Sequence, residues 1–141
     1  MPTWTKNTYS AFALLIHDLP VSDNTKGWLE SEFSIVFGED NFRFDRGLFA
    51  EAVSTGQVHR ISYPRAHTWS AETYRMVAEI LSRVNPEERG TVANSFAYLF
   101  EGHGANFDRG RFLRAVAQLA SLESEMREAR EQERRDQERE R

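Results

Sequence analysis

The sequence predicts an all-α protein, built as a tandem duplication of a three-helix unit with a charged C-terminal helical extension. Three observations predict it: a Phe-Asp-Arg segment occurs twice, apolar residues recur at helical spacing, and the C-terminal residues are almost all charged or polar. The chain has 141 residues, of which 40% are hydrophobic, enough to form a core. The expected organisation is a first helical unit (1–58), a linker (59–70), a second helical unit (71–122) and a charged tail (123–141).

The strongest evidence for duplication is a segment that recurs 63 positions later. Residues 33–53 align without a gap with residues 96–116, and nine of these positions are identical. The front of each unit repeats at an offset of 65, which places two extra residues between Leu19 and Gly27, where turn-forming residues gather. The identical pairs are Phe33/Phe96, Phe37/Phe100, Phe44/Phe107, Asp45/Asp108, Arg46/Arg109, Gly47/Gly110, Phe49/Phe112, Ala52/Ala115 and Val53/Val116.

Each unit is predicted to contain three helices. Apolar residues at intervals of three and four favour a first helix over about 6–17, with its copy over about 71–84. The same spacing favours a second helix over about 25–37, copied over about 87–100. The third helix of each unit is expected to begin after Asp45 and after Asp108.

The segment Phe-Asp-Arg-Gly-x-Phe is explained by the start of a helix. Asp45 is expected to be the N-cap, whose carboxylate accepts hydrogen bonds from amides of the first turn. Phe44 and Phe49 then form a hydrophobic staple across the helix start, and the second copy repeats the pattern. Gly47 is costly in a first turn unless another backbone packs close to it. Neither capping nor stapling requires Arg46 or Arg109, so both are candidates for contact with a partner.

The residues from 123 to 141 have a different composition. They comprise eight acids and six Arg, with Met126 and Ala129 as the apolar side chains. Pairs such as Glu123 with Arg127 support a helix as far as about Arg130, beyond which fraying is expected. No heptad of apolar residues occurs within 123–141, so a coiled-coil dimer is not expected from this tail.

No motif for catalysis, cofactor binding or metal binding is recognised. The chain has no Cys, and its four His (His17, His59, His67 and His103) lack the spacing of metal ligands. It has no Gly-x-Ser-x-Gly nucleophile elbow and no phosphate-binding glycine loop. We therefore expect a protein without cofactors that is not an enzyme.

The predicted linker combines basic and aromatic residues. His59, Arg60, Arg65 and His67 lie there without an acid, beside Tyr63 and Trp69. Such a surface can meet a nucleic-acid backbone or an acidic partner. The alternative is a plain linker, which the net charge of −4 favours, because nucleic-acid-binding domains are usually basic.

The longest apolar run, residues 11–16, is far too short for a membrane span, and a cytoplasmic location is expected.

The motif also carries a resemblance to a protein family. Residues 105–113, and more loosely 41–46, are similar to a segment of small uncharacterised proteins of actinobacteria and their phages. Those chains end a helical region with an Asn-x-x-Phe-Asp-Arg-x-Arg-Phe-like segment, followed by an apolar helix. Their usual Cys after the motif is replaced here by Val53 and Val116. The resemblance implies a helical fold and a phage or actinobacterial origin, and it implies no activity.

These observations favour a small non-enzymatic protein-binding module, such as a phage-encoded modulator or inhibitor of a host protein. The alternative is a nucleic-acid-binding protein that uses Arg residues of the linker and of the second unit. The candidate partner-binding residues are Arg46, Arg109, Arg60, Arg65 and Arg111.

Overall fold

A computed structural model describes residues 6–57, 71–103 and 107–140, and these residues form helices joined by short connections. The first half contains α1 (Lys6–Asp18), α2 (Asp23–Asp40) and α3 (Arg46–Thr55). The second half contains α4 (Ala71–Leu81), α5 (Pro86–His103) and α6 (Arg109–Arg139). The all-α prediction is confirmed for this part of the chain, in which no strand occurs.

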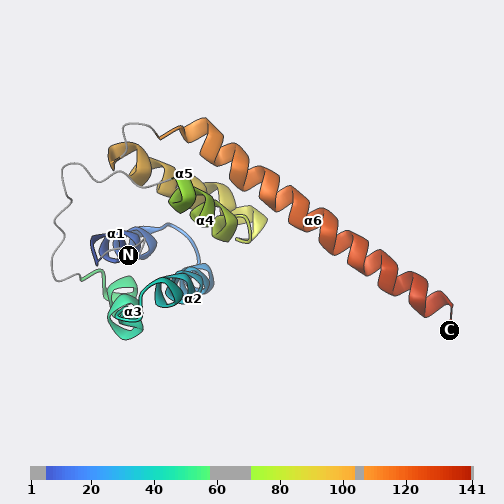
Figure 1. The fold of residues 1–141 in the computed structure, drawn as a ribbon, viewed down its shortest axis with the longest axis horizontal. Helices are drawn as coiled ribbons and strands as arrows, with labels where there is room; N and C mark the ends of the chain where they lie inside the picture. Colours follow the sequence, from blue (N-terminus) through green and yellow to red (C-terminus); the bar gives the residue numbers. More distant parts are fainter. Residues whose placement is uncertain (1–5, 58–70, 104–106, 141) are drawn as a thin grey trace.

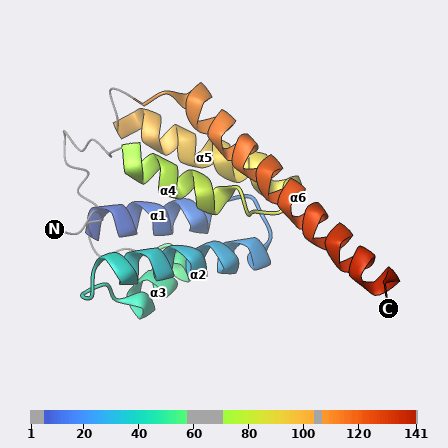
Figure 2. The ribbon, with the colours of Figure 1, turned by 45° about the vertical axis from the view of Figure 1, so that its right-hand side comes forward.

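The helices are arranged with the third helix of each half on the outside. In Figures 1 and 2, α3 and α6 lie at opposite edges of the molecule, with α1, α2, α4 and α5 between them. Within each half all three helices contact one another, and α2 contacts α4 across the middle. The C-terminal part of α6 projects well beyond the other helices.

The starts of α3 and α6 have the predicted capping geometry. The Asp45 carboxylate accepts a hydrogen bond from the backbone N–H of Leu48 at 3.1 Å, and that of Asp108 accepts from Arg111 at 3.0 Å. The stapled rings also meet, since Phe44 lies 5.7 Å from Phe49, measured between ring centroids. In the second copy the corresponding distance, between Phe107 and Phe112, is 5.6 Å. The expected N-caps and staples are therefore confirmed.

The glycine after the Arg lies beside the capping carboxylate. A Cβ on Gly47 would lie 3.3 Å from the Oδ1 of Asp45, with no other backbone close by. A Cβ on Gly110 would lie 3.6 Å from Oδ1 of Asp108 and 3.2 Å from Nη1 of Arg114. The glycine therefore leaves room for the capping carboxylate, and a close neighbouring backbone is not what requires it.

A tyrosine in the first helix of each half packs against the same two aligned phenylalanines. The Tyr9 ring lies 4.6 Å from Phe37 and 4.8 Å from Phe44. The corresponding distances from Tyr74 are 4.9 Å to Phe100 and 4.8 Å to Phe107. Burial raises the pKa of both tyrosine hydroxyl groups. These rings sit where helices one, two and three of each half converge.

The two halves share one hydrophobic core. Phe33 of α2 stacks on Phe96 of α5, with 5.6 Å between ring centroids and 28° between planes. Phe12 of α1 lies edge-on to Phe96 at 5.1 Å. All three side chains have no solvent exposure, and they belong to a continuous cluster with members from both halves. The units 1–58 and 71–122 of the sequence analysis therefore do not each enclose a separate core.

The N-termini of α2 and α5 are joined by a polar cluster. Ser22 caps α2, and Asn85 accepts a hydrogen bond from the Glu88 N–H at the start of α5. The Glu88 carboxylate accepts from the Thr25 hydroxyl at 2.6 Å, the Asn85 amide at 2.7 Å and the Ser22 backbone N–H at 2.6 Å. In a capping box, a Glu at this position bonds to the N-cap of its own helix. Here Glu88 bonds to the Asn85 side chain at the start of its own helix and also to the backbone N–H of Ser22, the N-cap of α2.

Most helix boundaries lie within a few residues of those predicted. The second helix of each half is longer at both ends, and α4 ends at Leu81 where a helix to residue 84 was expected. The largest difference is α6, which continues to Arg139, beyond the expected end near Arg130. Residues 123–139 contain neither Gly nor Pro, and the ion pair Glu131–Arg135, at 3.8 Å, bridges one turn. The predicted linker, residues 59–70, lies outside the described residues.

Candidate protein-binding groove

An open groove of about 860 Å³ runs between α1 and α5 and reaches the start of α6. Its apolar lining comes from Ala11 and Leu15 of α1 and from Leu99 of α5. The helices stand close enough for Phe12 to pack on Phe96 and Phe100 in the core. The groove is therefore the outer edge of the contact between the two halves.

Tyr98 is the most prominent side chain at the groove. It lies on α5 and is 78% exposed, whereas Phe96 and Phe100 on the same helix are fully buried. Ile35 occupies the aligned position of α2 and is 50% exposed. An exposed aromatic ring beside an apolar lining is typical of protein-binding surfaces.

Arg109 is held at one end of the groove. Its Nη2 donates a hydrogen bond to Asn94 Oδ1 at 2.6 Å, and its Nη1 lies 3.5 Å from Glu101 Oε2. These contacts tie the first turn of α6 to α5. Arg109 is one of the residues predicted to contact a partner; its guanidinium is bonded within the chain, and its side chain also lines the groove.

The aligned residue in the first half has different surroundings. Arg46 is exposed at the first position of α3. Ser31 and Gly38 stand at the positions aligned with Asn94 and Glu101. Since neither has a carboxylate, the ion pair of Arg109 cannot be repeated at Arg46.

The remaining candidate arginines are not brought together with these two. Arg111 has an exposed side chain in the first turn of α6, while Arg60 and Arg65 lie outside the described residues. Because α3 and the start of α6 lie at opposite edges of the molecule, Arg46 is remote from Arg109 and Arg111 (Figure 1). The described candidates therefore do not form one basic surface.

The groove is slightly acidic. Its charged lining residues are Asp18, Glu101 and Arg109, and the last two are paired with each other. The unpaired charge at the groove is thus the carboxylate of Asp18, which lies at the C-terminal end of α1. This arrangement favours a ligand that is apolar and basic.

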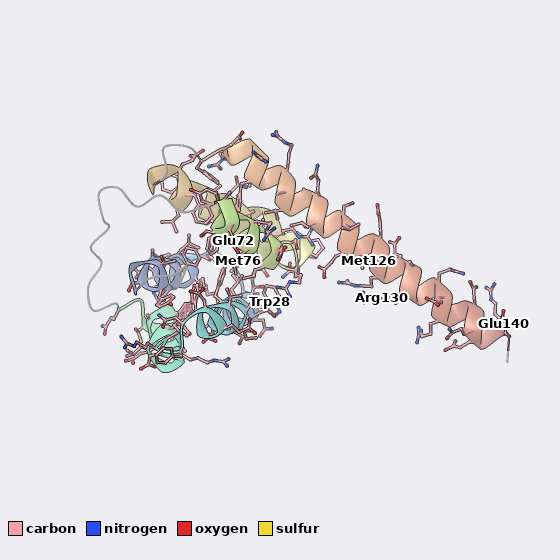
Figure 3. The ribbon with its side chains drawn as sticks, viewed as in Figure 1. Trp28, Glu72, Met76, Met126, Arg130 and Glu140 are labelled. Atoms are coloured by element: carbon pink, nitrogen blue, oxygen red, sulfur yellow. The ribbon has the colours of Figure 1, made fainter. Side chains whose placement is uncertain are left out.

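The surface that aligns with the groove is closed by side chains. The offsets of 63 and 65 place Arg83 opposite Asp18 in the alignment, and Glu32 opposite Ser95. Arg83 forms an ion pair with Glu32 at 3.3 Å and lies 5.9 Å from the centre of the Trp28 ring. Trp28 lies on the side of α2 that faces α4 (Figure 3). An aromatic side chain and an ion pair thus cover this side, whereas the α1–α5 side remains open.

Other features of the described residues include a second groove and a partly buried histidine contact. A smaller groove of about 530 Å³ lies between α5 and α6, lined largely by small side chains such as Ala93, Ala117 and Ser121. His17 donates from Nδ1 to the carbonyl oxygen of Val53 at 2.9 Å, joining α1 to α3. Within residues 6–57, 71–103 and 107–140, no group of three His, Asp or Glu is placed to hold a metal ion.

Tyr98 was not among the predicted contact residues, although its position in the sequence distinguishes it. The apolar face of α5 is marked by Val92, Phe96, Leu99 and Phe100, and Tyr98 lies off that face. A large aromatic residue on the polar side of a helix is a candidate contact residue. The partners of Arg109 had no comparable signal, because they depend on how the first turn of α6 packs against α5.

Comparisons with protein-family models, with curated proteins and with solved structures found no match to this chain. In the described part of the chain, no helix has both the length and the apolar character needed to cross a bilayer.

Proposed function

We propose that this chain is a small non-enzymatic protein-binding module whose contact site is the α1–α5 groove. The observation that carries the proposal is the exposed Tyr98 beside an apolar lining in an open groove of about 860 Å³. Aromatic side chains dominate the binding energy of many protein interfaces, because they bury a large area with few rotatable bonds. The ligand is a protein segment that places apolar side chains on Leu15 and Leu99.

The tandem duplication gives this site its context. We infer that residues 33–53 and 96–116 are copies, which the matching caps and ring distances of the two halves support. Two copies packed together present two related surfaces, one between α1 and α5 and one between α2 and α4. The surface between α2 and α4 is covered by Trp28, Arg83 and Glu32, and the surface between α1 and α5 is open. This divergence between the two surfaces fits a module that binds one partner per chain.

The ligand's chemistry follows from the groove. An amphipathic helix or extended segment with an apolar face suits the lining, and a Lys or Arg beside that face pairs with Asp18. Nucleic acid fits poorly, because the free charge of the groove is negative and the described arginines are dispersed. In biological terms, such a module suits a phage-encoded modulator of a host protein, which acts by occupying its partner.

A peptide selection tests this proposal directly. The full chain is immobilised and used to select from a displayed library of random peptides, with the variant Tyr98→Ala as counter-selection. We expect the enriched peptides to combine apolar and basic residues. They should bind Tyr98→Ala at least tenfold more weakly than the unaltered chain, because the substitution removes an aromatic anchor of the interface.

Ile35→Ala is the matched control, because Ile35 is exposed at the aligned position on the other side of the molecule. Its binding to the selected peptides should equal that of the unaltered chain. Peptides that bind both variants equally well, or the absence of any enrichment, would contradict the proposal. A gel-shift assay at low salt examines the alternative, and a complex with RNA or DNA that dissociates steeply with salt would favour nucleic acid instead.

A further inference from the structure

The projecting part of α6 has an apolar stripe that nothing in the described chain covers. Leu122 is 53% exposed and Met126 is 48% exposed, and they lie one turn apart. Ala129 follows three residues after Met126 and is exposed as well, whereas Ala115 and Leu119, which precede Leu122 on the same face, are partly buried against the core. These alternating intervals of four and three residues are the spacing at which one helix packs along another. The stripe begins before residue 123, which is why the composition of the tail alone did not indicate it.

Charged residues continue the same face of α6 in both directions. Towards the N-terminus the face carries Arg111, with Arg114 beside it, and towards the C-terminus it carries Glu133, Asp136 and Glu140. All five side chains are exposed. The face therefore changes from basic, through apolar, to acidic along the length of the helix.

We propose that α6 pairs with α6 of a second copy of this chain in antiparallel orientation. In that orientation the basic end of each helix lies against the acidic end of the other, and Arg111 pairs with Glu140. The midpoint between these two residues falls at Glu125 and Met126, so the apolar stripes of both copies meet at the centre. A parallel pair would instead place like charges opposite each other at both ends of the helix.

The isolation of this segment supports the same conclusion. Met126, Arg130 and Glu140 lie on the part of α6 that stands clear of the other helices (Figure 3). Every residue from Ser121 to Glu140 is exposed. A helix with no packing partner is only marginally stable in water, and an exposed ion pair such as Glu131–Arg135 stabilises it little. A twofold pair uses the same face of both chains and closes on itself.

This interface is separate from the α1–α5 groove, and each of them can fail without the other. The groove lies among α1, α5 and Arg109, whereas the exposed stripe lies on the projecting part of α6, and only the basic end of the pair, at Arg111, is near the groove.

Oligomeric state is the first measurement. Light scattering coupled to size exclusion should give the mass of a dimer for the full chain at about 100 µM, a concentration that detects even weak pairing. L122E/M126E should give a monomer, with the thermal unfolding midpoint of the helical body unchanged. The control S121E/S124E adds the same charge on another face of α6 and should remain a dimer. A monomeric wild-type chain, or a dimer that survives L122E/M126E, would overturn the proposal.

Orientation is tested by charge reversal. R111E/R114E makes both ends of the stripe acidic and should weaken the dimer by at least tenfold. Adding E133R/D136R/E140R to the same chain restores opposite charges in an antiparallel pair and should restore the dimer. Failure of this rescue would refute the antiparallel charge pairing.

Because the chain has no Cys, single introduced cysteines also allow spin-label distances to be measured. Labels at Glu125→Cys should lie roughly 10–20 Å apart across the pair, given helix spacings of about 8–10 Å. Labels at Gln137→Cys should lie roughly 35 Å apart, from a rise of about 1.5 Å per residue. A short distance at both positions would indicate a parallel pair and would refute the orientation.

Discussion

At the scale of single residues, two glycines show that the same residue type can have opposite effects on stability. Gly56 ends α3 with φ of +73°, and a Cβ there would lie 2.7 Å from the His17 ring. That ring is itself fixed by its hydrogen bond to Val53. Gly27 lies within α2, and a Cβ there would meet no atom within 4 Å.

We therefore expect opposite effects from the same substitution. Gly56→Ala should lower the free energy of unfolding by about 1–3 kcal/mol, because it combines a left-handed backbone with a clash. Gly27→Ala should raise the free energy of unfolding by about 0.5–1 kcal/mol, because alanine restricts the unfolded chain and favours helix. Urea denaturation of both variants measures the two changes. A neutral Gly56→Ala would show that the end of α3 can rearrange.

At the scale of helices, the joint between α2 and α5 depends on one carboxylate. Hydrogen bonds from the Thr25 hydroxyl, the Asn85 amide and the Ser22 backbone lower the pKa of Glu88 from 4.5 to about 2. A carboxyl whose pKa is lower in the folded chain stabilises the fold in its charged form. This stabilisation is complete above about pH 4.5 and is lost as the pH falls through about 2.

Glu88→Gln should accordingly lower the thermal unfolding midpoint at pH 7. The difference from the wild-type chain should shrink as the pH falls from 4.5 towards 2, because the wild-type carboxylate becomes protonated over that range. Circular dichroism melts at several pH values measure this. Glu87→Gln removes an acid from the same first turn of α5 and serves as the control. A difference between wild type and Glu88→Gln that stays constant down to pH 2 would contradict the assignment.

At the scale of the whole molecule, the sequence predicted what depends on neighbouring residues. The caps at Asp45 and Asp108, the stapled rings and most of the helix positions are set by interactions within a few residues, and the structure confirms them. Contacts between segments far apart in the chain could not be predicted from the sequence. Glu88 lies 66 residues from Ser22, and the groove exists only because α1 packs on α5. Nothing local in the sequence indicates either feature, nor the Asn94 and Glu101 partners of Arg109.

The shared core makes a prediction about the two halves. Phe33 and Phe96 have no solvent exposure in the whole chain, and each would be uncovered if the other half were removed. Units of this size are only marginally stable, and each half would also lose the rings that cover its core. We expect residues 1–70 and 71–141, produced separately, to lack a cooperative thermal transition, and to regain one when mixed in equal amounts.

Near-ultraviolet circular dichroism is the appropriate probe, because the aromatic rings of both halves meet in the core. The control is the full chain cut at a protease site introduced within residues 59–70, which should keep its aromatic signal and melt cooperatively. If either fragment alone melted near the midpoint of the full chain, the halves would be independent domains. The contact between Phe33 and Phe96 would then join two halves that each fold alone, and neither half would need it to fold.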